Sequence, residues 1–398
     1  MTQAMSRGRR HRVIAALGIA QILSWGASYY LPAILARPIA ADMGWPLAWV
    51  VGGLSLGLLV AGLAAIRVGR AIERHGGRPV LAASAVLIAT GLVLLAAAPN
   101  LAVYFLAWAV IGIGMAAGLY DAAFSALGRT FGADARLAIT HLTLWGGFAS
   151  TVCWPLSALL VEGLGWRGAA LAYAAIMLLV VLPLHLLGLP REERRDGAGA
   201  TAAGAGTQGE TPAARRPLVF ALLAAMMTAG GTIMAIWSVH AIAILQAGGL
   251  SLIAAVRLGA LVGPAQVGGR VAEMLSGGRH HPLWTLAVSV ALVAGGLTAL
   301  WAEFPIPAIA LIAYGAGNGI WSIARGTVPL ALFGSAGYAV QMGRLATPSL
   351  IAQAAAPPLG AFLLEWAGTP GTMAVLSALA LSNLVAVALL AAASAPRR

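Results

Sequence analysis

Hydrogen-bonding and aromatic side chains recur at helical spacing inside several long apolar segments of this chain. Gln21, Trp25 and Tyr29 follow one another at intervals of four residues, so they share one face of a helix. The same kind of spacing pairs His141 with Trp145, Trp237 with His240, and Asn318 with Trp321. Such stripes could contact a bound solute, or they could join neighbouring helices and anchor helix ends. Spacing alone leaves both interpretations open.

Three charged residues also stand inside apolar segments, where a charge is costly unless it has a partner or a function. Asp121 could carry a proton or form a structural ion pair, and Arg325 occupies a comparable place later in the chain. Arg257 lies early in its segment, with no acidic residue near it in the sequence. It could extend to the membrane interface, or it could attract an anionic ligand.

The composition shows what must surround these segments. The 398 residues are 60% hydrophobic and 9% charged, with a mean hydropathy of +0.89. A soluble domain carries about 25% charged residues, so a lipid bilayer must be the solvent for much of this chain. The net charge of +12 comes from arginines spread over short gaps between apolar runs, whereas a nucleic-acid-binding surface would cluster them. We therefore expect a membrane protein that contacts lipid and binds no nucleic acid.

A helix that crosses the bilayer needs ~20 mostly apolar residues. The sequence predicts twelve such helices, and thus an all-α membrane protein. The eighth is the least regular, because Arg257 interrupts it and Pro264 and several glycines loosen it. The twelve predicted spans cover residues 13–36, 46–66, 79–97, 101–127, 137–161, 167–189, 218–245, 250–271, 283–302, 306–332, 340–364 and 370–394.

The arginines predict the orientation of these spans. If the N-terminus is cytoplasmic, nearly all arginines fall on the cytoplasmic side, and only Arg37 and Arg167 lie opposite. Both termini are then cytoplasmic, as in a multi-pass protein of a bacterial inner membrane. A stretch rich in Ala, Gly, Thr and charge follows the sixth span and predicts a flexible linker. We expect a six-helix bundle over 1–189, the linker over 190–217 and a second bundle over 218–398.

The two halves share short motifs at nearly equal spacing. Gly69 begins a Gly-Arg-apolar-apolar-Glu pattern after the second span, and Gly269 begins the same pattern after the eighth. Gly112-Ile-Gly114 in the fourth span corresponds likewise to Gly315-Ala-Gly317 in the tenth. Two matches at one spacing indicate duplication, which is typical of transporters built from repeated helical bundles.

The loop after the second span carries the strongest likeness to a known family. From Gly69 it runs GRAIERHGGR, which is similar to the pattern G-x-L-x-D-R-x-G-R-R/K of the major facilitator superfamily. Glu73 replaces the aspartate and Gly77 replaces an arginine of that pattern. The Gly165-Trp166-Arg167 turn before the sixth span is also common in the family. Over its whole length the chain therefore resembles these transporters, which implies two pseudo-symmetric six-helix bundles.

This resemblance implies roles for the charged residues of the two repeated loops. In the first half Asp121 would pair with Arg74 or Arg78 of the loop that contains Glu73. In the second half Glu273 would pair with Arg325, with the charges reversed. Such pairs would act as latches that hold the cytoplasmic gate shut and break as the bundles rock.

The subfamily stays open. The arginine that many proton-coupled members carry in the fourth span falls at Trp108, and the glycine-proline motif of drug–proton antiporters is degenerate around Trp154 and Pro155. The eleventh-span region GYAVQMGRLATPSLIAQAAAPPLG is similar in its residue pattern to the same region of monocarboxylate transporters. Their substrate-binding arginine of the eighth span would fall near Ala265 and is absent.

We therefore expect a secondary transporter that moves a small organic solute, anionic or amphipathic, by alternating access. Uptake of a carboxylate and efflux of a toxic compound both fit, as does a non-transporting membrane sensor with the same fold. Protons are a candidate coupling ion, and a monomer is expected. No enzyme motif such as H-E-x-x-H or G-x-x-x-x-G-K-[ST] occurs, and Cys153 is the single cysteine, so no catalytic activity, cofactor or metal site is expected. The resemblance implies which spans line the central cavity, and most of the expected solute contacts lie on those spans. The expected contacts are Gln21, Trp25, Tyr29, His141, Trp145, Trp237, His240, Arg257, Asn318 and Trp321.

Overall fold

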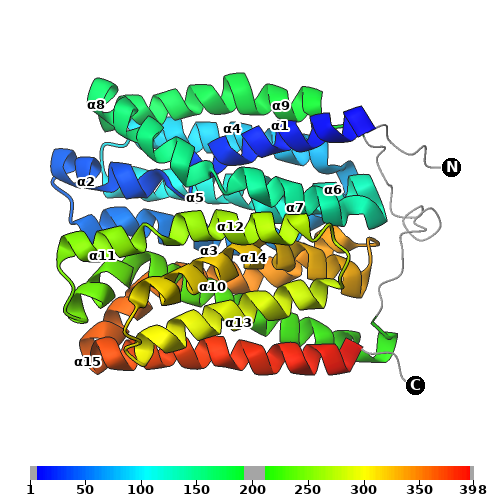
Figure 1. Ribbon diagram of the computed structural model, residues 1–398. Coiled ribbons are helices and arrows are strands. Elements are labelled where there is room, and N and C mark those ends of the chain that lie inside the picture. The colour runs from blue at the N-terminus through cyan, green and yellow to red at the C-terminus, as the bar shows by residue number, and fades with distance from the viewer. Residues whose placement is uncertain (1–6, 192–210, 395–398) are drawn as a thin grey trace. The chain divides into compact units, whose positions relative to one another are not determined.

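The computed structural model describes residues 7–191 and 211–394, and its regular elements in these ranges are helices. The chain forms two compact units. Unit 1 comprises Met1–Gly206 and Ala336–Thr347, and unit 2 comprises Thr207–Ser335 and Pro348–Arg398. Within each unit the long helices run side by side (Figure 1). Most of the expected linker, residues 192–210, lies outside the described part of the chain.

Unit 1 contains the first nine α-helices and two short turns of other helix types. Asn100 begins one of these helices by accepting a hydrogen bond from the Val103 backbone N–H at 3.0 Å, which satisfies one of the free donors at a helix start. The elements are α1 (Arg7–Gly26), α2 (Leu31–Met43), α3 (Leu47–His75), α4 (Gly77–Ala96), α5 (Leu101–Gly118), α6 (Tyr120–Phe131), η1 (Gly132–Asp134), α7 (Ala135–Gly146), α8 (Ala149–Ile176), η2 (Met177–Val181) and α9 (Leu182–Gly188).

Unit 2 contains the remaining helices, except that the beginning of the last one belongs to unit 1. The predicted eighth span is split into two helices around Ala260 and Leu261, close to Pro264 and the glycines that made this span irregular in the sequence. The elements are η3 (Ala213–Arg215), α10 (Arg216–Ala247), α11 (Leu252–Gly259), α12 (Val262–Leu275), α13 (Pro282–Trp301), α14 (Pro307–Phe333) and α15 (Tyr338–Ser394).

The prediction of twelve spans is confirmed. Nine segments of the described chain are long and apolar enough to cross a membrane, but Ala135–Gly188 has 54 residues and α15 has 57. A straight helix of either length would be ~80 Å long, far more than the ~30 Å of a hydrocarbon core. Each is interrupted near its middle by a glycine with a left-handed backbone, Gly165 (φ 69°) and Gly368 (φ 64°), and so contains two spans. With α14 at the place of the predicted tenth span, the total is twelve.

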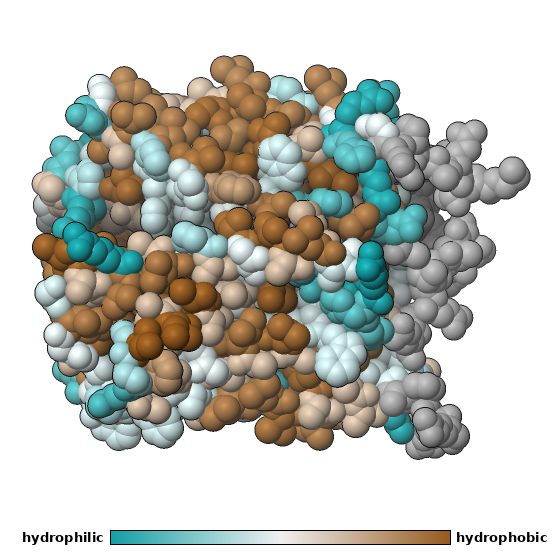
Figure 2. Space-filling view, in the orientation of Figure 1, coloured by the Kyte–Doolittle hydropathy of each residue, from teal (hydrophilic) through white to brown (hydrophobic). Residues whose placement is uncertain are grey.

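The outer faces of these helices suit a bilayer. On the face drawn in Figure 2, hydrophobic residues cover the sides of the helices, and hydrophilic residues gather mainly near the helix ends. Large apolar side chains such as Leu179, Leu187 and Trp366 are also exposed. Exposed apolar surface of this kind suits contact with lipid rather than with water. The chain is a multi-pass membrane protein.

The repeated glycines occupy equivalent places in the two units. Gly112 of α5 packs against the backbone of Gly57 in α3, and a side chain there would collide with it. Gly315 of α14 packs in the same way on α12, where an added Cβ would meet the Val262 carbonyl oxygen at 2.8 Å. Small residues allow membrane helices to approach closely, so packing explains this part of the sequence repeat.

Asp42 joins the end of α2 to the second half of α8. The Trp166 indole N–H donates to the Asp42 carboxylate at 2.9 Å, and Arg167 pairs with the same oxygen while its guanidinium stacks 4.1 Å from the Trp166 ring. Arg167 is one of the two arginines that the orientation analysis leaves on the arginine-poor side. Its position is thus explained by a local partner.

Candidate functional site

Three of the spans in unit 1 are interrupted. The first span changes from α1 to α2 between Gly26 and Leu31, and the fourth changes from α5 to α6 at Leu119, whose backbone is extended (φ −81°, ψ −168°). The fifth changes from α7 to α8 after Gly146. An interruption frees backbone groups that a membrane helix normally satisfies itself, and these groups then need other partners.

Gln21 supplies a partner at one of these interruptions. Its side chain is fully buried, and its Nε2 donates to the carbonyl oxygen of Gly118, the last residue of α5, at 2.6 Å. Its Oε1 accepts a hydrogen bond from the Trp25 indole N–H at 3.1 Å. One amide therefore links the break in the fourth span to an aromatic ring on the first.

Trp25 and three tyrosine rings beside it form what we call the aromatic cluster, composed of Trp25, Tyr29, Tyr30 and Tyr120. The Trp25 ring lies 5.2 Å from Tyr29, 5.9 Å from Tyr30 and 5.1 Å from Tyr120, measured between centroids. Tyr120 is the first residue of α6, and its hydroxyl donates to the Thr143 carbonyl oxygen near the end of α7 at 3.3 Å. Tyr120 is buried, whereas the other three rings are only half-buried. The cluster can therefore offer ring faces to the apolar part of a ligand.

The sequence analysis found two of the four members of this cluster, Trp25 and Tyr29. The structure brings Gln21, Trp25 and Tyr29 together, as their spacing predicts. Trp145 of α7 packs its ring against the same face of α1, at Gly18, one turn before Gln21. His141 is half-buried one turn earlier on α7.

Two members of the cluster were missed. Tyr30 lies outside the four-residue spacing of the stripe, and Tyr120 is separated from it in the sequence by two spans. The sequence contains local signs of the helix interruptions beside these two residues: Tyr29-Tyr30 stands just before Leu31-Pro32, and Gly118 precedes Tyr120.

In unit 2 two of the predicted contacts serve packing. Trp237 is buried in the apolar core, with its ring 5.3 Å from that of Tyr314. His240 lies within 3.0 Å of the Pro357 carbonyl oxygen through its Nε2, which must donate, and so joins α10 to α15. Their direct contact with a solute stays a prediction.

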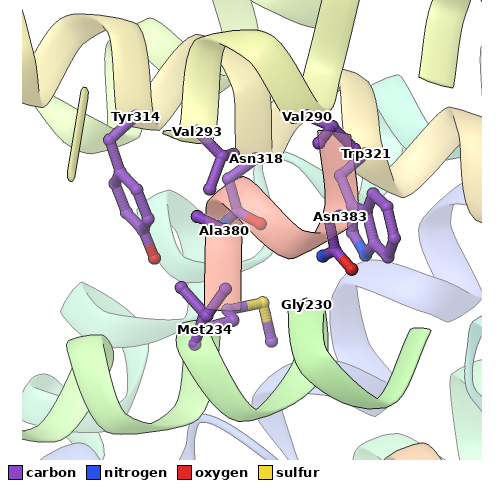
Figure 3. Close-up of a pocket in the computed structure, with 10 residues that line it drawn as sticks. Gly230, Met234, Val290, Val293, Tyr314, Asn318, Trp321, Ala380 and Asn383 are labelled. Atoms are coloured by element: carbon purple, nitrogen blue, oxygen red, sulfur yellow. The ribbon is translucent and has the colours of Figure 1, made fainter. Parts of the chain in front are cut away.

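Asn318 and Trp321 share one face of α14 and line a small cavity within unit 2 (Figure 3). Asn383, from the second half of α15, lines the same cavity and was missed by the sequence analysis. Its only signal was an amide within an otherwise apolar run.

Arg257 lies in the last turn of α11, and its side chain is exposed. In residues 7–191 and 211–394 no acidic side chain pairs with it. The exposed face of α11 also includes Ile253 and Val256. The guanidinium is thus available to a ligand or to the membrane interface.

The residues of the first predicted latch lie near the ends of three helices. Glu73 and Arg74 are in the last turns of α3, Arg78 is in the first turn of α4, and Asp121 is in the first turn of α6. Arg129 donates to the backbone oxygen of Glu73. A carboxylate is also favoured at a helix N-terminus, where the helix dipole is positive. The pairing of Asp121 with Arg74 or Arg78 stays a prediction.

A double-mutant cycle tests this pairing. We expect Asp121→Asn and Arg74→Ala each to reduce transport, and the double variant to lose less than the sum, because contacting residues couple. The measurement is initial uptake rate by purified variants in proteoliposomes. Strictly additive losses would contradict the pairing, and a variant that loses proton-driven uptake but keeps solute exchange would make Asp121 a proton carrier instead.

In the second predicted latch, Glu273 has two partners that the sequence analysis missed. The Glu273 carboxylate accepts a hydrogen bond from the Thr285 hydroxyl at 2.7 Å and lies 3.2 Å from His280 Nε2. Arg325 is half-buried on α14, one turn after Ser322, whose hydroxyl accepts a hydrogen bond from the buried Arg270 at 3.0 Å. The pairing of Glu273 with Arg325 stays a prediction.

Comparison with solved structures shows the same fold in membrane transporters. The human organic anion transporter MFSD10 (TETRAN) superposes with a TM-score of 0.71 at 17% identity, over 95% of this chain and 99% of its own. A variant of the E. coli fucose:proton symporter FucP superposes with a TM-score of 0.71 at 15% identity, over 95% of this chain and 98% of its own. The proton:xylose symporter XylE superposes with a TM-score of 0.73 at 11% identity, over 96% of this chain and 95% of its own.

Sequence comparison identifies the family. A Thermoproteus tenax relative, described as an uncharacterized 38 kDa protein in a 23S RNA operon, is 33% identical over 154 residues. That alignment spans 39% of this chain and 40% of the relative. The family pattern of the Major Facilitator Superfamily matches residues 17–343. Since this match covers most of the chain and the solved transporters share its fold, the chain belongs to the Major Facilitator Superfamily.

Proposed function

We propose that this secondary transporter moves a small amphipathic organic solute, and that the aromatic cluster contacts the apolar part of that solute. The observation that carries this proposal is that Gln21 and Tyr120 join three interrupted spans beside the half-buried rings of the cluster. Interrupted helices typically form the solute and ion sites of secondary transporters, because their free backbone groups can bind ligands. No nucleotide-binding loop occurs in the sequence, so an ion or solute gradient drives transport.

The charge of the solute is the second part of the proposal. Arg257 is an exposed cation without an acidic partner in the described chain, and a guanidinium binds a carboxylate through two parallel hydrogen bonds. One structural neighbour is described as an organic anion transporter, and two others are described as proton symporters of sugars. These descriptions support a small organic solute and protons as the coupling ion. We therefore favour an amphipathic monocarboxylate that is moved by alternating access.

Substitution of Trp25 tests the contact between solute and cluster. Phenylacetate and its uncharged analogue phenylacetamide serve as probes, and uptake is measured in proteoliposomes. Trp25→Ala is expected to raise the apparent KM for both probes about tenfold, because an aromatic contact contributes ~0.5–1.5 kcal/mol beyond the burial of its area. Trp25→Phe keeps a ring but loses the bond to Gln21, so it should lie between wild type and alanine.

Trp366→Ala is the matched control, because Trp366 is 76% exposed on the outer face of α15. Its kinetics should equal those of wild type. Unchanged KM in a folded Trp25→Ala variant would show that the cluster only packs helices.

The orientation is a further part of the proposal. We infer that the protein lies in the inner membrane of a bacterium with both termini in the cytoplasm, because the arginine bias is consistent across the loops. Reporter fusions after Ala98 and after Arg195 are expected to report opposite sides of the membrane. A reporter signal from the same side for both fusions would contradict this orientation.

A further inference from the structure

A small cavity in unit 2 is lined by residues from the middle parts of four helices (Figure 3). Its walls come from α10, α13, α14 and the second half of α15. Its volume is about 20 Å³, which is enough for a water molecule or a single small group. The indole of Trp321 reaches this wall because Gly230 leaves room, where a Cβ would come within 2.8 Å of the ring.

Three polar side chains in this wall lack protein partners. In the part of the chain that the structure describes, no hydrogen bond satisfies the side chains of Asn318, Asn383 or Trp321. Asn383 is only 6% exposed, and both amides line the cavity. Asn318 is half-buried, and a buried amide such as that of Asn383 is almost always hydrogen-bonded. The cavity therefore presents three unpaired hydrogen-bonding side chains to a molecule that enters it.

The wall defines the chemistry of that molecule. An amide both donates and accepts, whereas an indole N–H only donates. No lining residue carries a charge: besides these three they are glycine, alanine, valine, isoleucine, methionine and Tyr314. A carboxylate would find no cation here, and a metal cation would face N–H donors. A neutral hydroxyl oxygen, which accepts from N–H groups and donates to an amide oxygen, suits all three.

We propose that this cavity binds a neutral hydroxyl group, supplied either by water or by the transported solute. The hydroxyl oxygen accepts from Trp321 or an amide N–H, and its proton is donated to the carbonyl oxygen of Asn318 or Asn383. Occupancy ties α14 to the second half of α15 through hydrogen bonds. The solute alternative rests on the proposed function, whereas the water alternative does not.

The decisive variants remove one amide while keeping its size. Asn383→Leu and Asn318→Leu are compared with wild type, and Ser382→Ala is the matched control, since Ser382 is an exposed neighbour that bonds only the Leu379 carbonyl oxygen. Density maps that resolve ordered water are obtained without solute and with mandelate. Transport kinetics use mandelate and phenylacetate, which differ by one hydroxyl group.

Water in the cavity predicts density beside the two amides in the map without solute. That density is lost in Asn383→Leu, and the ratio of mandelate to phenylacetate KM stays as in wild type. A solute hydroxyl predicts density only with mandelate, and Asn383→Leu then raises the mandelate KM about tenfold while the phenylacetate KM is unchanged.

Either pattern supports the proposal. An empty cavity in both maps, together with Asn383→Leu as stable as wild type and equal in its kinetics for both probes, would overturn it. The map without solute does not depend on transport. Failure to transport either probe would therefore count against the proposed function without deciding the content of the cavity.

Discussion

Gln21→Leu is expected to lower the free energy of unfolding by about 1–3 kcal/mol and to reduce transport at least tenfold. The leucine has nearly the same size but leaves the Gly118 carbonyl oxygen without its donor at a fully buried position. An unsatisfied buried polar group costs about that amount. It also frees the Trp25 ring, whose N–H donates to Gln21. Thermal unfolding in detergent and uptake in proteoliposomes measure the two effects.

Two further variants separate the two hydrogen bonds of Gln21. Gln21→Glu keeps an acceptor for Trp25 but sets a carboxylate oxygen against the Gly118 carbonyl oxygen, so it should be at least as damaging as leucine. Gln246→Leu changes an exposed glutamine in the last turn of α10 and should leave both quantities unchanged. If Gln21→Leu unfolds at the wild-type temperature and transports normally, the interrupted fourth span does not depend on this amide.

Arg257→Ala is the second substitution with a large expected effect. If the guanidinium binds the solute carboxylate, the alanine variant is nearly inactive toward anionic solutes while it remains folded and inserted. Arg257→Lys keeps the charge but loses the two-pronged hydrogen bonding, so its apparent KM should rise while transport persists. The measurement is uptake of phenylacetate against phenylacetamide by monodisperse purified variants.

The uncharged probe provides the internal control for this series. Phenylacetamide lacks the carboxylate, so its uptake should respond much less to either substitution. Wild-type kinetics for phenylacetate in Arg257→Ala would show that Arg257 extends to the membrane interface, and the proposal of an anionic solute would lose its main support.

The overall fold could be predicted from sequence because hydropathy acts over whole spans. A run of apolar residues long enough to cross lipid must form a helix, since the backbone has no other partner there. The repeat of Gly112 and Gly315 was also visible, and the structure assigns it to close helix packing. The irregular eighth span was visible through Pro264, whose ring restricts the helix.

The interruptions of the first and fourth spans could not be predicted in the same way. Leu119 is as apolar as its neighbours, so its extended backbone leaves no mark in the hydropathy. The contacts that stabilise it come from Gln21 and Tyr120, which hydropathy places on separate helices. Tertiary packing, rather than local propensity, decides such a break.

The candidate site could be predicted only in part from the sequence, for a related reason. Helical spacing shows which side chains share a face, but it does not show what that face meets. Trp237 and Trp321 follow similar patterns, yet Trp237 packs in the core and Trp321 lines a cavity. Asn383 has no polar neighbour at helical spacing on its span, so only the structure relates it to Asn318.

Solute accumulation in proteoliposomes tests the central claim, transport driven by a gradient, most directly. Wild-type protein is reconstituted, an inward proton gradient is imposed, and labelled phenylacetate and related amphipathic carboxylates are followed inside the vesicles together with internal pH. We expect saturable accumulation above the external concentration, with solute-dependent proton entry, and loss of both when an ionophore removes the gradient. Saturable solute binding without any entry into the vesicles, for every solute that binds, would contradict the account and indicate a membrane sensor.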